Sequence, residues 1–590
     1  MWPANSSFSN KPAKKPAYLW KRPLKKDDTF GVYFDETYKD TPTNTQYNQV
    51  HIPGANARGT NFVAMEDRVY IIQGKECLVL DSATGTQLAV FSLPASADGR
   101  QADSWGYIGV YADSLVAGEG FAQFTRKLDL PAEKKDSRSK WRFTDYDKSA
   151  SDALVVMDRK TGAVRWRIEA KHGFIHNAVA VAGGVLYCLD KLPPGVEQRQ
   201  ARRGKSRSNT YRLLALDIRT GKPRWEKSEN AFGTWLSVSE EHGILLQSTR
   251  PSSDTVREEN GTRMIAYRAD SGDVLWDKEM RYGTPPILHG EKIIAGGRMF
   301  GLKTGEALER VDPITGVKSA WTYVSTKGCN YPVACQNLIT FRSSAAAFYD
   351  LSGDGGTGHF GGFKSGCTSN LVAADGVLNA PDYTRTCSCS FQNQTSLALV
   401  HMPELELWTH NDLRYEGQRV QRAGVNFGAP GDRRAANGTL WTEYPSVGGP
   451  SPNIPVRVEG TPTWFRHHAS RISGDGEKWV AASGMEGAER VVIQVATSAA
   501  ADDSKAPHYT VRLVFVETGE ETKPGQRVFH VSLGGKTVLS GLDIVAETKA
   551  PLRMLVKEFK GIPIANELVI GLEATGPRPT ILCGVELVAE

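Results

Sequence analysis

The sequence predicts an all-β protein in which a β-propeller of seven or eight blades is followed by a β-sandwich of jelly-roll type. Three observations support this prediction. A turn of the form Asp-x-x-Thr-Gly recurs after apolar runs in the first two thirds of the chain, and short alternating strands fill the last third. In addition, 58 glycines among 590 residues indicate many turns.

The turn repeat is easiest to see between Leu213 and Trp225, where an apolar strand, a tight turn and a second strand follow one another. Its copies are Asp81-Ser-Ala-Thr84-Gly85, Asp158-Arg-Lys-Thr161-Gly162, Asp217-Ile-Arg-Thr220-Gly221, Asp270-Ser271-Gly272 and Asp312-Pro-Ile-Thr315-Gly316. Glycine supplies the positive φ that this turn needs, and we expect the tryptophans that follow to dock between adjacent blades. The repeat therefore predicts the fold and not the chemistry.

Seven inner strands can be aligned by hand, which predicts seven blades. They begin at Phe62, Ile108, Ala178, Leu236, Ile287, Val333 and Leu371. The segment from Ala17 to Arg22 resembles an outer strand without its preceding strands, and it would complete an eighth blade by pairing with the last one. The alternative is an arm laid over the surface. We expect a flexible basic arm over 1–26 and the propeller over 27–410.

The repeat Asp-x-x-Thr-Gly-x-x-x-Trp resembles the quinoprotein-like (PQQ-like) propeller family, which includes quinone-dependent dehydrogenases and non-catalytic outer-membrane assembly factors. A dehydrogenase of this kind implies PQQ and calcium, together with a pair of adjacent cysteines. In this chain Ser388 separates Cys387 from Cys389, so there is no Cys-Cys pair. We therefore do not expect PQQ as a cofactor, and calcium is left open.

Five of the eight cysteines lie in loops rich in Gly, Ser and Thr, and we interpret this cluster first as disulfides. The disulfide candidates are Cys329, Cys335, Cys367, Cys387 and Cys389. Redox thiols are one alternative. A metal site is the other, but no Cys-x-x-Cys pair or histidine at ligand spacing supports it, so no metal ligands are predicted. We expect Cys77, Cys188 and Cys583, which lie in apolar strands, to be core residues.

Disulfides form in oxidising compartments, and this points to a periplasmic or extracellular protein. No apolar run is long enough to span a bilayer. The first residues lack the features of a secretory signal, so we expect that a signal peptide has been removed. The formal net charge of +5 on this length gives no reason to expect nucleic-acid binding.

The character of the chain changes after Trp408. A linker over 411–421 leads to a segment of short alternating strands, over 422–590, which predicts the sandwich. This segment resembles a malectin-type carbohydrate-binding domain. The resemblance rests on Asn426-Phe-Gly428, the strand Tyr509–Phe515, Arg527-Val-Phe-His-Val, Gly541-Leu-Asp543-Ile and Ile581-Leu-Cys-Gly-Val-Glu. It implies sugar binding by aromatic and polar groups at one end of the sandwich, with a core role as the alternative for each candidate. The candidates are Asp432, Trp441, Tyr444 and His467.

The propeller offers a second candidate site, because the residue before each inner strand should face the mouth of the central channel. The ligand-binding candidates there are Asn61, Tyr107, Asn177, Trp235 and Asn370. Aromatic and amide side chains suit stacking on a sugar and hydrogen bonding to it. If the surface is catalytic, the expected reaction is β-elimination on an acidic polysaccharide. His176 or Tyr331 would then act as base, and Arg342 would neutralise the carboxylate.

Three classes of function are compatible with these features. The favoured class is a glycan-directed protein whose sandwich binds carbohydrate and whose propeller is a second binding or catalytic surface, a polysaccharide lyase if it is an enzyme. The second class is a non-catalytic scaffold or assembly factor with protein partners on the propeller. The third is a PQQ-dependent dehydrogenase, which the absent Cys-Cys pair argues against. The expected partner is therefore a carbohydrate or polysaccharide.

Overall fold

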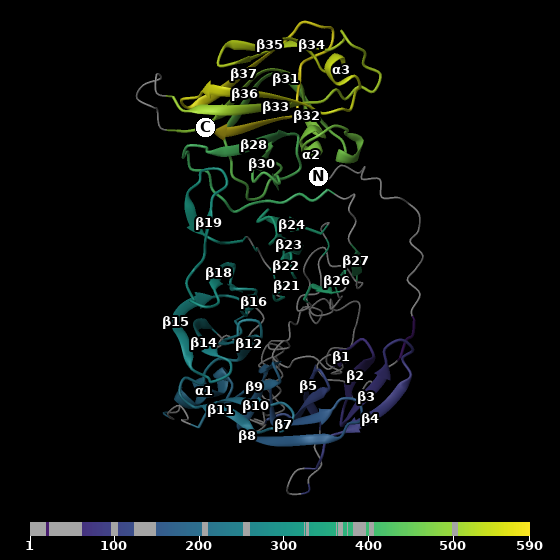
Figure 1. Ribbon diagram of the computed structural model, residues 1–590, viewed down its shortest axis with the longest axis vertical. Helices are drawn as coiled ribbons and strands as arrows, with labels where there is room; N and C mark the ends of the chain where they lie inside the picture. The colour runs from purple at the N-terminus through teal and green to yellow at the C-terminus, as the bar shows by residue number, and fades with distance from the viewer. Residues whose placement is uncertain are drawn as a thin grey trace, which may run out of the picture. The chain divides into compact units, whose positions relative to one another are not determined.

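The structure of the protein is a computed structural model (Figure 1). It describes residues 19–22, 62–95, 99, 104–122, 149–202, 204, 210–251, 260–323, 325, 328, 330–360, 363, 370–374, 376–380, 397–400, 406–497 and 506–590. The chain divides into two compact units, which we describe separately. The first comprises residues 1–290 with 385–388, and the second comprises 291–384 with 389–590.

The first unit is built from antiparallel sheets of the propeller-blade type. One four-stranded sheet holds β1 (Phe62–Ala64), β2 (Arg68–Gln73), β3 (Glu76–Asp81) and β4 (Gln87–Ser92). A seven-stranded sheet holds β5 (Trp105–Tyr111), β6 (Ser114–Glu119), β7 (Ala150–Asp158), β8 (Val164–Ala182), β9 (Val185–Asp190), β10 (Arg212–Asp217) and β11 (Pro223–Lys227). Another four-stranded sheet holds β12 (Trp235–Ser239), β13 (Ile244–Ser248), β14 (Gly261–Arg268) and β15 (Val274–Tyr282), and β16 (Ile287–His289) follows it. Helix α1 (Pro194–Arg202) lies between β9 and β10.

The seven-stranded sheet is two blades that share the long strand β8, drawn as an extended arrow in Figure 1. The first part of β8 pairs with β7, and the part from Val179 onward pairs with β9. Between them, the carboxylate of Asp190 accepts the backbone N–H groups of Lys171, His172 and Gly173 at 2.7, 2.8 and 3.0 Å. A fully buried aspartate thus satisfies the backbone donors at the point where β8 leaves one blade and enters the next.

The Asp-x-x-Thr-Gly turns are closed by the aspartate. The Oδ1 atom of Asp217 accepts the backbone N–H groups of Arg219 and Thr220 and the hydroxyl of Thr220, at 3.0–3.1 Å. Asp81 and Asp158 make the same three contacts. The glycine that ends the turn has φ of +70° at Gly221, a conformation that L side chains rarely adopt.

One copy of the repeat differs from its predicted alignment. In the turns at Asp158 and Asp217, the turn glycine donates its N–H to the carbonyl of the aspartate itself. In the β14–β15 turn, Gly272 donates to Arg268 at 2.9 Å, so Arg268 and not Asp270 occupies the aspartate position. A further copy, Gly301-Leu-Lys-Thr-Gly305, has glycine at that position, and Gly305 donates to Gly301 at 2.7 Å. Both turns keep their backbone geometry without the aspartate side chain.

The repeat tryptophans Trp166 and Trp225 each pack on the next turn along the chain, as the sequence predicts. The indole N–H of Trp166 donates to the carbonyl of Ile218 at 2.8 Å, and Trp225 donates to Ala269 at 3.0 Å. A Cβ atom on Gly221 would lie 2.7 Å from the ring of Trp166. The glycine is therefore needed for the close approach of this ring as well as for its φ.

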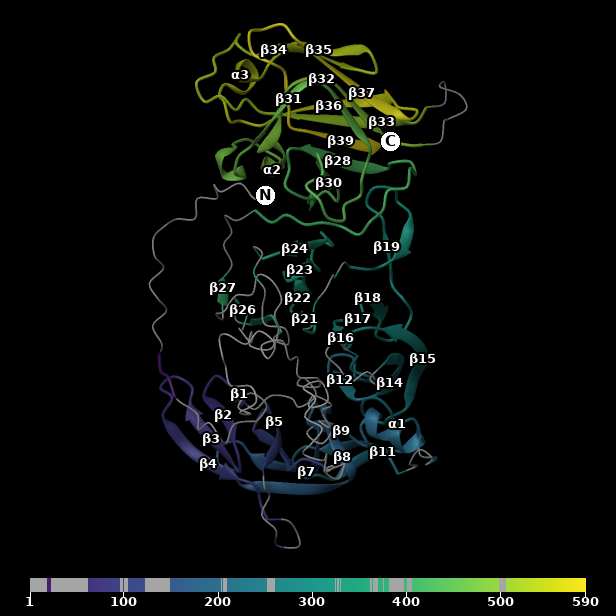
Figure 2. The same ribbon diagram turned by 180° about the vertical axis from the view of Figure 1, so that it is seen from behind.

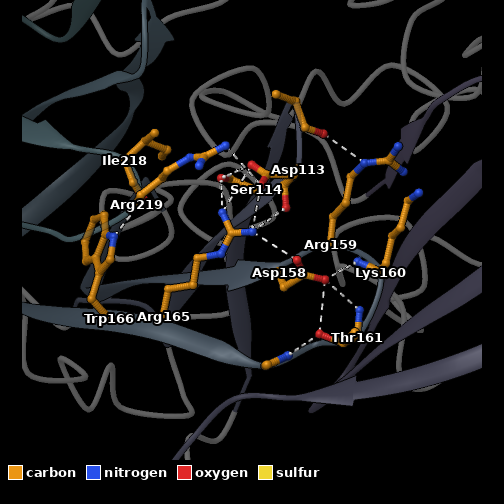
Figure 3. Close-up of polar contacts among 12 residues, drawn as sticks. Asp113, Ser114, Asp158, Arg159, Lys160, Thr161, Arg165, Trp166, Ile218 and Arg219 are labelled. Carbon is orange, nitrogen blue, oxygen red and sulfur yellow. Dashed lines mark hydrogen bonds and ion pairs between the residues drawn. The ribbon is translucent and has the colours of Figure 1, made fainter.

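Ion pairs also join neighbouring blades through these turns, as Figure 3 shows around Asp158. Arg159 follows the turn aspartate and donates to Asp67 of the preceding blade at 2.9 Å. Arg219, the second residue after the turn aspartate Asp217, lies 3.5 Å from Asp113 of the preceding blade. Within one blade, Arg165 of β8 also pairs with Asp113 and Asp158 at 3.0 and 2.9 Å. The blades are thus linked both by packed indoles and by ion pairs at their turns.

The second unit contains further blade strands and the sandwich. The blade strands are β17 (Lys292–Ala295), β18 (Arg298–Gly301), β19 (Glu309–Val311), β20 (Lys318–Ala320), β21 (Val333–Ala334), β22 (Leu338–Ser343), β23 (Ala345–Asp350), β24 (Thr357–His359), β25 (Val372–Ala374), β26 (Val377–Ala380) and β27 (Leu397–Val400). Strands β21 to β24 form a four-stranded sheet in chain order. Each predicted inner strand coincides with an observed strand: β1, β5, β8, β12, β16, β21 and β25. The blade count and the closure of the ring stay predictions.

Two packed sheets form the sandwich, drawn in green and yellow in Figures 1 and 2. The first has the order β29 (Arg433–Arg434), β30 (Leu440–Tyr444), β28 (Arg422–Phe427), β39 (Gly584–Ala589), β33 (His508–Phe515), β36 (Leu555–Pro563). The second has the order β31 (Val456–Arg466), β32 (Ser483–Gln494), β37 (Glu567–Ala574), β34 (Val528–Leu533), β35 (Lys536–Asp543), with β38 (Ile581–Leu582) beside β32. Alternate residues such as Val511, Leu513 and Phe515 enter one apolar core between the sheets. The all-β fold class predicted from the sequence is confirmed.

A second, smaller core lies on the other face of the first sheet. Short helices cover it, namely η6 (Ala469–Arg471) and α2 (Lys478–Ala481), whereas α3 (Ile544–Thr548) follows β35. Trp441, Trp479 and Cys583 are among its buried residues. In the part of the chain that the structure describes, no helix has the length and apolarity of a membrane span.

The segment before β28 is held on both sides. His410 and Thr357 of β24 exchange backbone hydrogen bonds at 2.8 and 2.9 Å, and Thr409 exchanges them with Asp432 at 2.9 and 2.7 Å. The side chain of Asn411 also donates to the Asp432 carboxylate at 3.2 Å. The residues just before the predicted linker are therefore anchored, whereas the domain boundaries themselves stay predictions.

Candidate functional site

In the first unit, two of the predicted mouth residues lie together. The rings of Tyr107 and His176 are 5.9 Å apart, and Phe121 lies 6.0 Å from His176. The Nε2 atom of His176 is 2.9 Å from the hydroxyl of Ser151, a partner that no sequence motif identifies. Both members of this Ser–His pair are buried, at 0% and 2% exposure.

The Ser151 hydroxyl is packed against backbone. A Cβ atom on Gly118 would lie 2.3 Å from this oxygen, and one on Gly106 would lie 2.5 Å from it. Burial also raises the pKa of Tyr107 to about 12, so its phenol stays protonated at neutral pH. The arrangement gives His176 a fixed hydrogen-bond partner within a closely packed region. The role of His176 as a catalytic base stays a prediction.

The remaining mouth candidates are divided between the units. Asn177 is half-buried on β8, and Trp235, at the start of β12, donates its indole N–H to Ser237 at 2.9 Å. In the second unit the side chain of Asn370 accepts the backbone N–H of Tyr331 at 2.9 Å, which brings these two candidates together. Asn61 lies outside the described residues.

Arg342, predicted to neutralise a carboxylate, is 5% exposed on β22. Its backbone N–H donates to Asn330 at 3.1 Å. Tyr331, like Arg342, belongs to the second unit and is 7% exposed. His176 belongs to the first unit. The three predicted catalytic residues are therefore divided between the units, one in the first and two in the second.

Of the disulfide candidates, Cys335 is half-buried, and Cys329, Cys367, Cys387 and Cys389 lie outside the described residues. The disulfides therefore stay predictions. Cys77, Cys188 and Cys583 are fully buried, which confirms them as core residues. Burial raises the pKa of the Cys77 thiol to about 12, so it is not ionised at neutral pH.

In the sandwich, Asp432 and Trp441 lie in the interior. Asp432 is fully buried, and its carboxylate accepts hydrogen bonds from Ser451 at 2.7 Å and Asn411 at 3.2 Å. Burial raises its pKa to about 7. Trp441 is 4% exposed, and its ring lies 6.0 Å from that of Trp479. Both side chains are thus buried among protein partners, and their role as sugar ligands stays a prediction.

Tyr444, in contrast, ends strand β30 and is only half-buried. Its ring lies 6.0 Å from that of Trp464 at an interplanar angle of 61°. Trp464 comes from β31, the edge strand of the opposite sheet, and is 38% exposed. This aromatic pair, Tyr444 and Trp464, therefore joins the two sheets at the exposed edge formed by β31. Trp464 was missed in the sequence because it follows no repeat or family motif.

An exposed loop over 445–450 borders the aromatic pair, and buried groups hold both of its ends. At its start, the carboxylate of Glu443 accepts the N–H of Val447 at 3.1 Å and the hydroxyl of Ser446 at 3.3 Å. At its end, Ser451 is bound to Asp432. His467, the fourth sandwich candidate, packs at 6.0 Å against Phe465, and its Nδ1 atom lies 3.1 Å from Arg471.

Two family models match the chain. Residues 144–352 match the model described as outer membrane protein assembly factor BamB, which is built of PQQ-like repeats, and residues 504–580 match the malectin domain. The chain combines PQQ-like repeats with a malectin-like domain. Both resemblances drawn from the sequence are thereby confirmed, and the residues that match the malectin domain hold the strands from β33 to β37 of the sandwich.

Several solved structures resemble parts of the PQQ-like and malectin-like chain at low similarity. BamB from Moraxella catarrhalis is 14% identical, with 54% of this chain and 76% of that chain covered and a TM-score of 0.32. A β-glucuronidase from Bacteroides uniformis is 15% identical, with 29% and 18% covered and a TM-score of 0.22. The ANX2 ectodomain from Arabidopsis thaliana is 14% identical, with 28% and 48% covered and a TM-score of 0.22.

The chain thus spans less than two thirds of the length of the glucuronidase and of the ANX2 ectodomain. No curated protein sequence matches it.

Proposed function

We propose that the protein binds carbohydrate through its malectin-like sandwich, with Tyr444 and Trp464 as the contact surface. The observation that carries this proposal is the aromatic pair itself, in which a half-buried ring and a 38% exposed ring from opposite sheets meet at 6.0 Å. Exposed apolar surface that is rimmed by polar residues is typical of ligand- and partner-binding sites. The match of residues 504–580 to the malectin domain supports carbohydrate binding by the sandwich, whereas Tyr444 and Trp464 lie before the matched range.

The physical basis is the two-sided character of a sugar ring. Its C–H faces stack on aromatic rings, and its hydroxyls need hydrogen-bonding groups beside those rings. The loop over 445–450 offers backbone groups next to Tyr444, and Glu443 and Asp432 hold the ends of this loop. A surface held by buried contacts loses little conformational entropy when it binds.

We assign the PQQ-like propeller a supporting role, as a second glycan surface or a surface for protein partners, and we place the protein in the periplasm or outside the cell. Lyase chemistry by His176, Tyr331 and Arg342 is a separate hypothesis. It needs its own assay, in which purified protein is incubated with uronic-acid polysaccharides and absorbance from new unsaturated ends is followed.

A glycan array probed with the purified full-length chain tests the binding proposal. We expect retention on at least one class of oligosaccharide and loss of that retention in Trp464→Ala. Val556→Ala is the matched control, because Val556 is 39% exposed on the edge strand β36 of the other sheet. Absence of retention on every glycan, with a folded protein, would contradict the proposal.

A further inference from the structure

Arg433 lies between two tryptophan rings on the outer face of the first sandwich sheet. Its guanidinium carbon is 4.9 Å from the ring centre of Trp479 and 5.8 Å from that of Trp408. The two rings stand nearly perpendicular, 5.8 Å apart at 85°. Cation–π contact with two nearly perpendicular indoles restricts the position of the guanidinium.

The guanidinium makes no ion pair or hydrogen bond with the residues that the structure describes, although Arg433 is half-buried. The neighbouring Arg434 behaves differently, since its guanidinium donates to the carbonyls of Gly438 and Gly353 at 3.3 and 3.4 Å. An arginine with a packing role normally satisfies its donors in this way. The N–H donors of Arg433 are thus oriented but not used by the protein.

Two carboxylates stand near this guanidinium, and other donors fix their positions. Glu406 accepts the backbone N–H of Ala469 at 2.5 Å and the indole N–H of Trp408 at 3.4 Å. Glu477 accepts the indole N–H of Trp479 at 2.6 Å. Each carboxylate thus accepts the indole N–H of one of the two tryptophans that contact Arg433. Burial lowers the pKa of Arg433, and the negative charges of Glu406 and Glu477 act against this lowering.

We propose that Arg433, Trp408, Glu406 and Glu477 form a second subsite, for a neutral sugar ring. The guanidinium would donate to sugar hydroxyls, the two carboxylates would accept from them, and the half-buried Trp408 ring would offer a face for stacking. An anionic ligand is disfavoured because two carboxylates surround a single cation. This inference rests on the proposed glycan binding. It goes further by naming a second subsite and by specifying that the sugar bound there is uncharged.

The test is isothermal titration of the full chain with neutral glucose-, xylose- and mannose-based tetrasaccharides and with trigalacturonate. Arg433→Met keeps the length of the side chain and removes its donors, and Arg433→Lys keeps the charge and removes the planar fork. We expect the neutral oligosaccharide that binds best to lose about tenfold or more in affinity in both variants. The midpoint of thermal unfolding is measured for each variant as a folding control.

The outcomes separate the two proposals. Unchanged affinity in a folded Arg433→Met protein, together with loss in Trp464→Ala, overturns the subsite and leaves the proposed function standing. Tighter binding of trigalacturonate that depends on Arg433 overturns the neutral assignment. Absence of binding to every probe by the unmodified chain overturns the subsite for these sugars, and absence of retention on the glycan array as well contradicts the proposed function itself. If Arg433→Met does not fold, Trp408→Leu replaces it, with the same expected loss.

Discussion

The indole N–H of Trp20 donates a hydrogen bond to the backbone carbonyl of Ser82 at 2.9 Å. Ser82 follows the turn aspartate Asp81, just as Ile218, the partner of Trp166, follows Asp217. A Cβ atom on Gly85 would lie 2.5 Å from the ring of Trp20, the same relation that Gly221 has to Trp166. At the turn of Asp217, this place is taken by Trp166, the tryptophan of the preceding blade. Trp20 takes the same place at the turn of the first blade.

Replacing Trp20 by alanine should therefore destabilise the propeller as an internal repeat tryptophan does. We expect Trp20→Ala to lose about 1–3 kcal/mol of unfolding free energy, because a packed aromatic ring and its hydrogen bond are removed. Chemical denaturation with Trp166→Ala as the comparison measures this. An unchanged denaturation midpoint for Trp20→Ala would mean that the N-terminal segment is an arm without a structural role.

The close approach of indole and glycine can be separated from the strain of a positive φ. Gly221 has φ of +70° and faces the Trp166 ring, whereas Gly243 has φ of +60° and no atom within 4 Å of an added Cβ. Gly221→Ala should cost about 2 kcal/mol more than Gly243→Ala, since both pay for the backbone conformation but only the first displaces the ring. Equal losses in thermal unfolding would show that the ring contributes nothing to the requirement for glycine.

The absent aspartate in the β14–β15 turn suggests a stabilising change. Arg268 is exposed and occupies the position at which Asp158 and Asp217 close their turns. Arg268→Asn should place a side-chain oxygen near the N–H groups that the aspartates bind elsewhere, and it should raise stability by about 0.5–1 kcal/mol. Asparagine is chosen instead of aspartate because Asp270 and Asp273 are close in sequence and would repel a further carboxylate. A lower unfolding midpoint would contradict the assigned alignment.

Asp432 should make the stability of the sandwich depend on pH. Its pKa rises from 3.8 to about 7 on folding, so the folded state holds the proton more tightly than the unfolded state. Stability therefore falls as pH rises from about 4 to about 7, by on the order of 4 kcal/mol, and stays low above that range. In Asp432→Asn this fall should be strongly reduced. The comparison is made by urea unfolding at pH 4.5 and pH 8, and a parallel fall in both proteins would refute the assignment.

The sequence predicts the propeller part well because its signals are local. A turn aspartate, a glycine of positive φ and a tryptophan lie within nine residues, and each makes its contact as expected, for example at Asp217, Gly221 and Trp225. The correction at Arg268 shows the limit of the pattern, since backbone hydrogen bonds keep the turn when its side chain is lost.

The sandwich site is harder to predict because its residues meet only through the fold. Tyr444 and Trp464 come from different sheets, and Trp464 carries no motif. Asp432 is polar and lies in a loop-like sequence, yet it is fully buried because Asn411 and Ser451 satisfy its carboxylate. Burial of a polar group depends on partners distant in the sequence, and a local pattern does not identify them.

Carbohydrate binding by the Tyr444–Trp464 pair can be tested in one titration. Isothermal titration with the best oligosaccharide from the array is carried out on the full chain, on Trp464→Ala and on Val556→Ala. We expect at least about a tenfold loss of affinity in Trp464→Ala, because stacking on an exposed indole is removed, and unchanged binding in Val556→Ala. Equal affinity in all three folded proteins would show that the aromatic pair is not the binding surface.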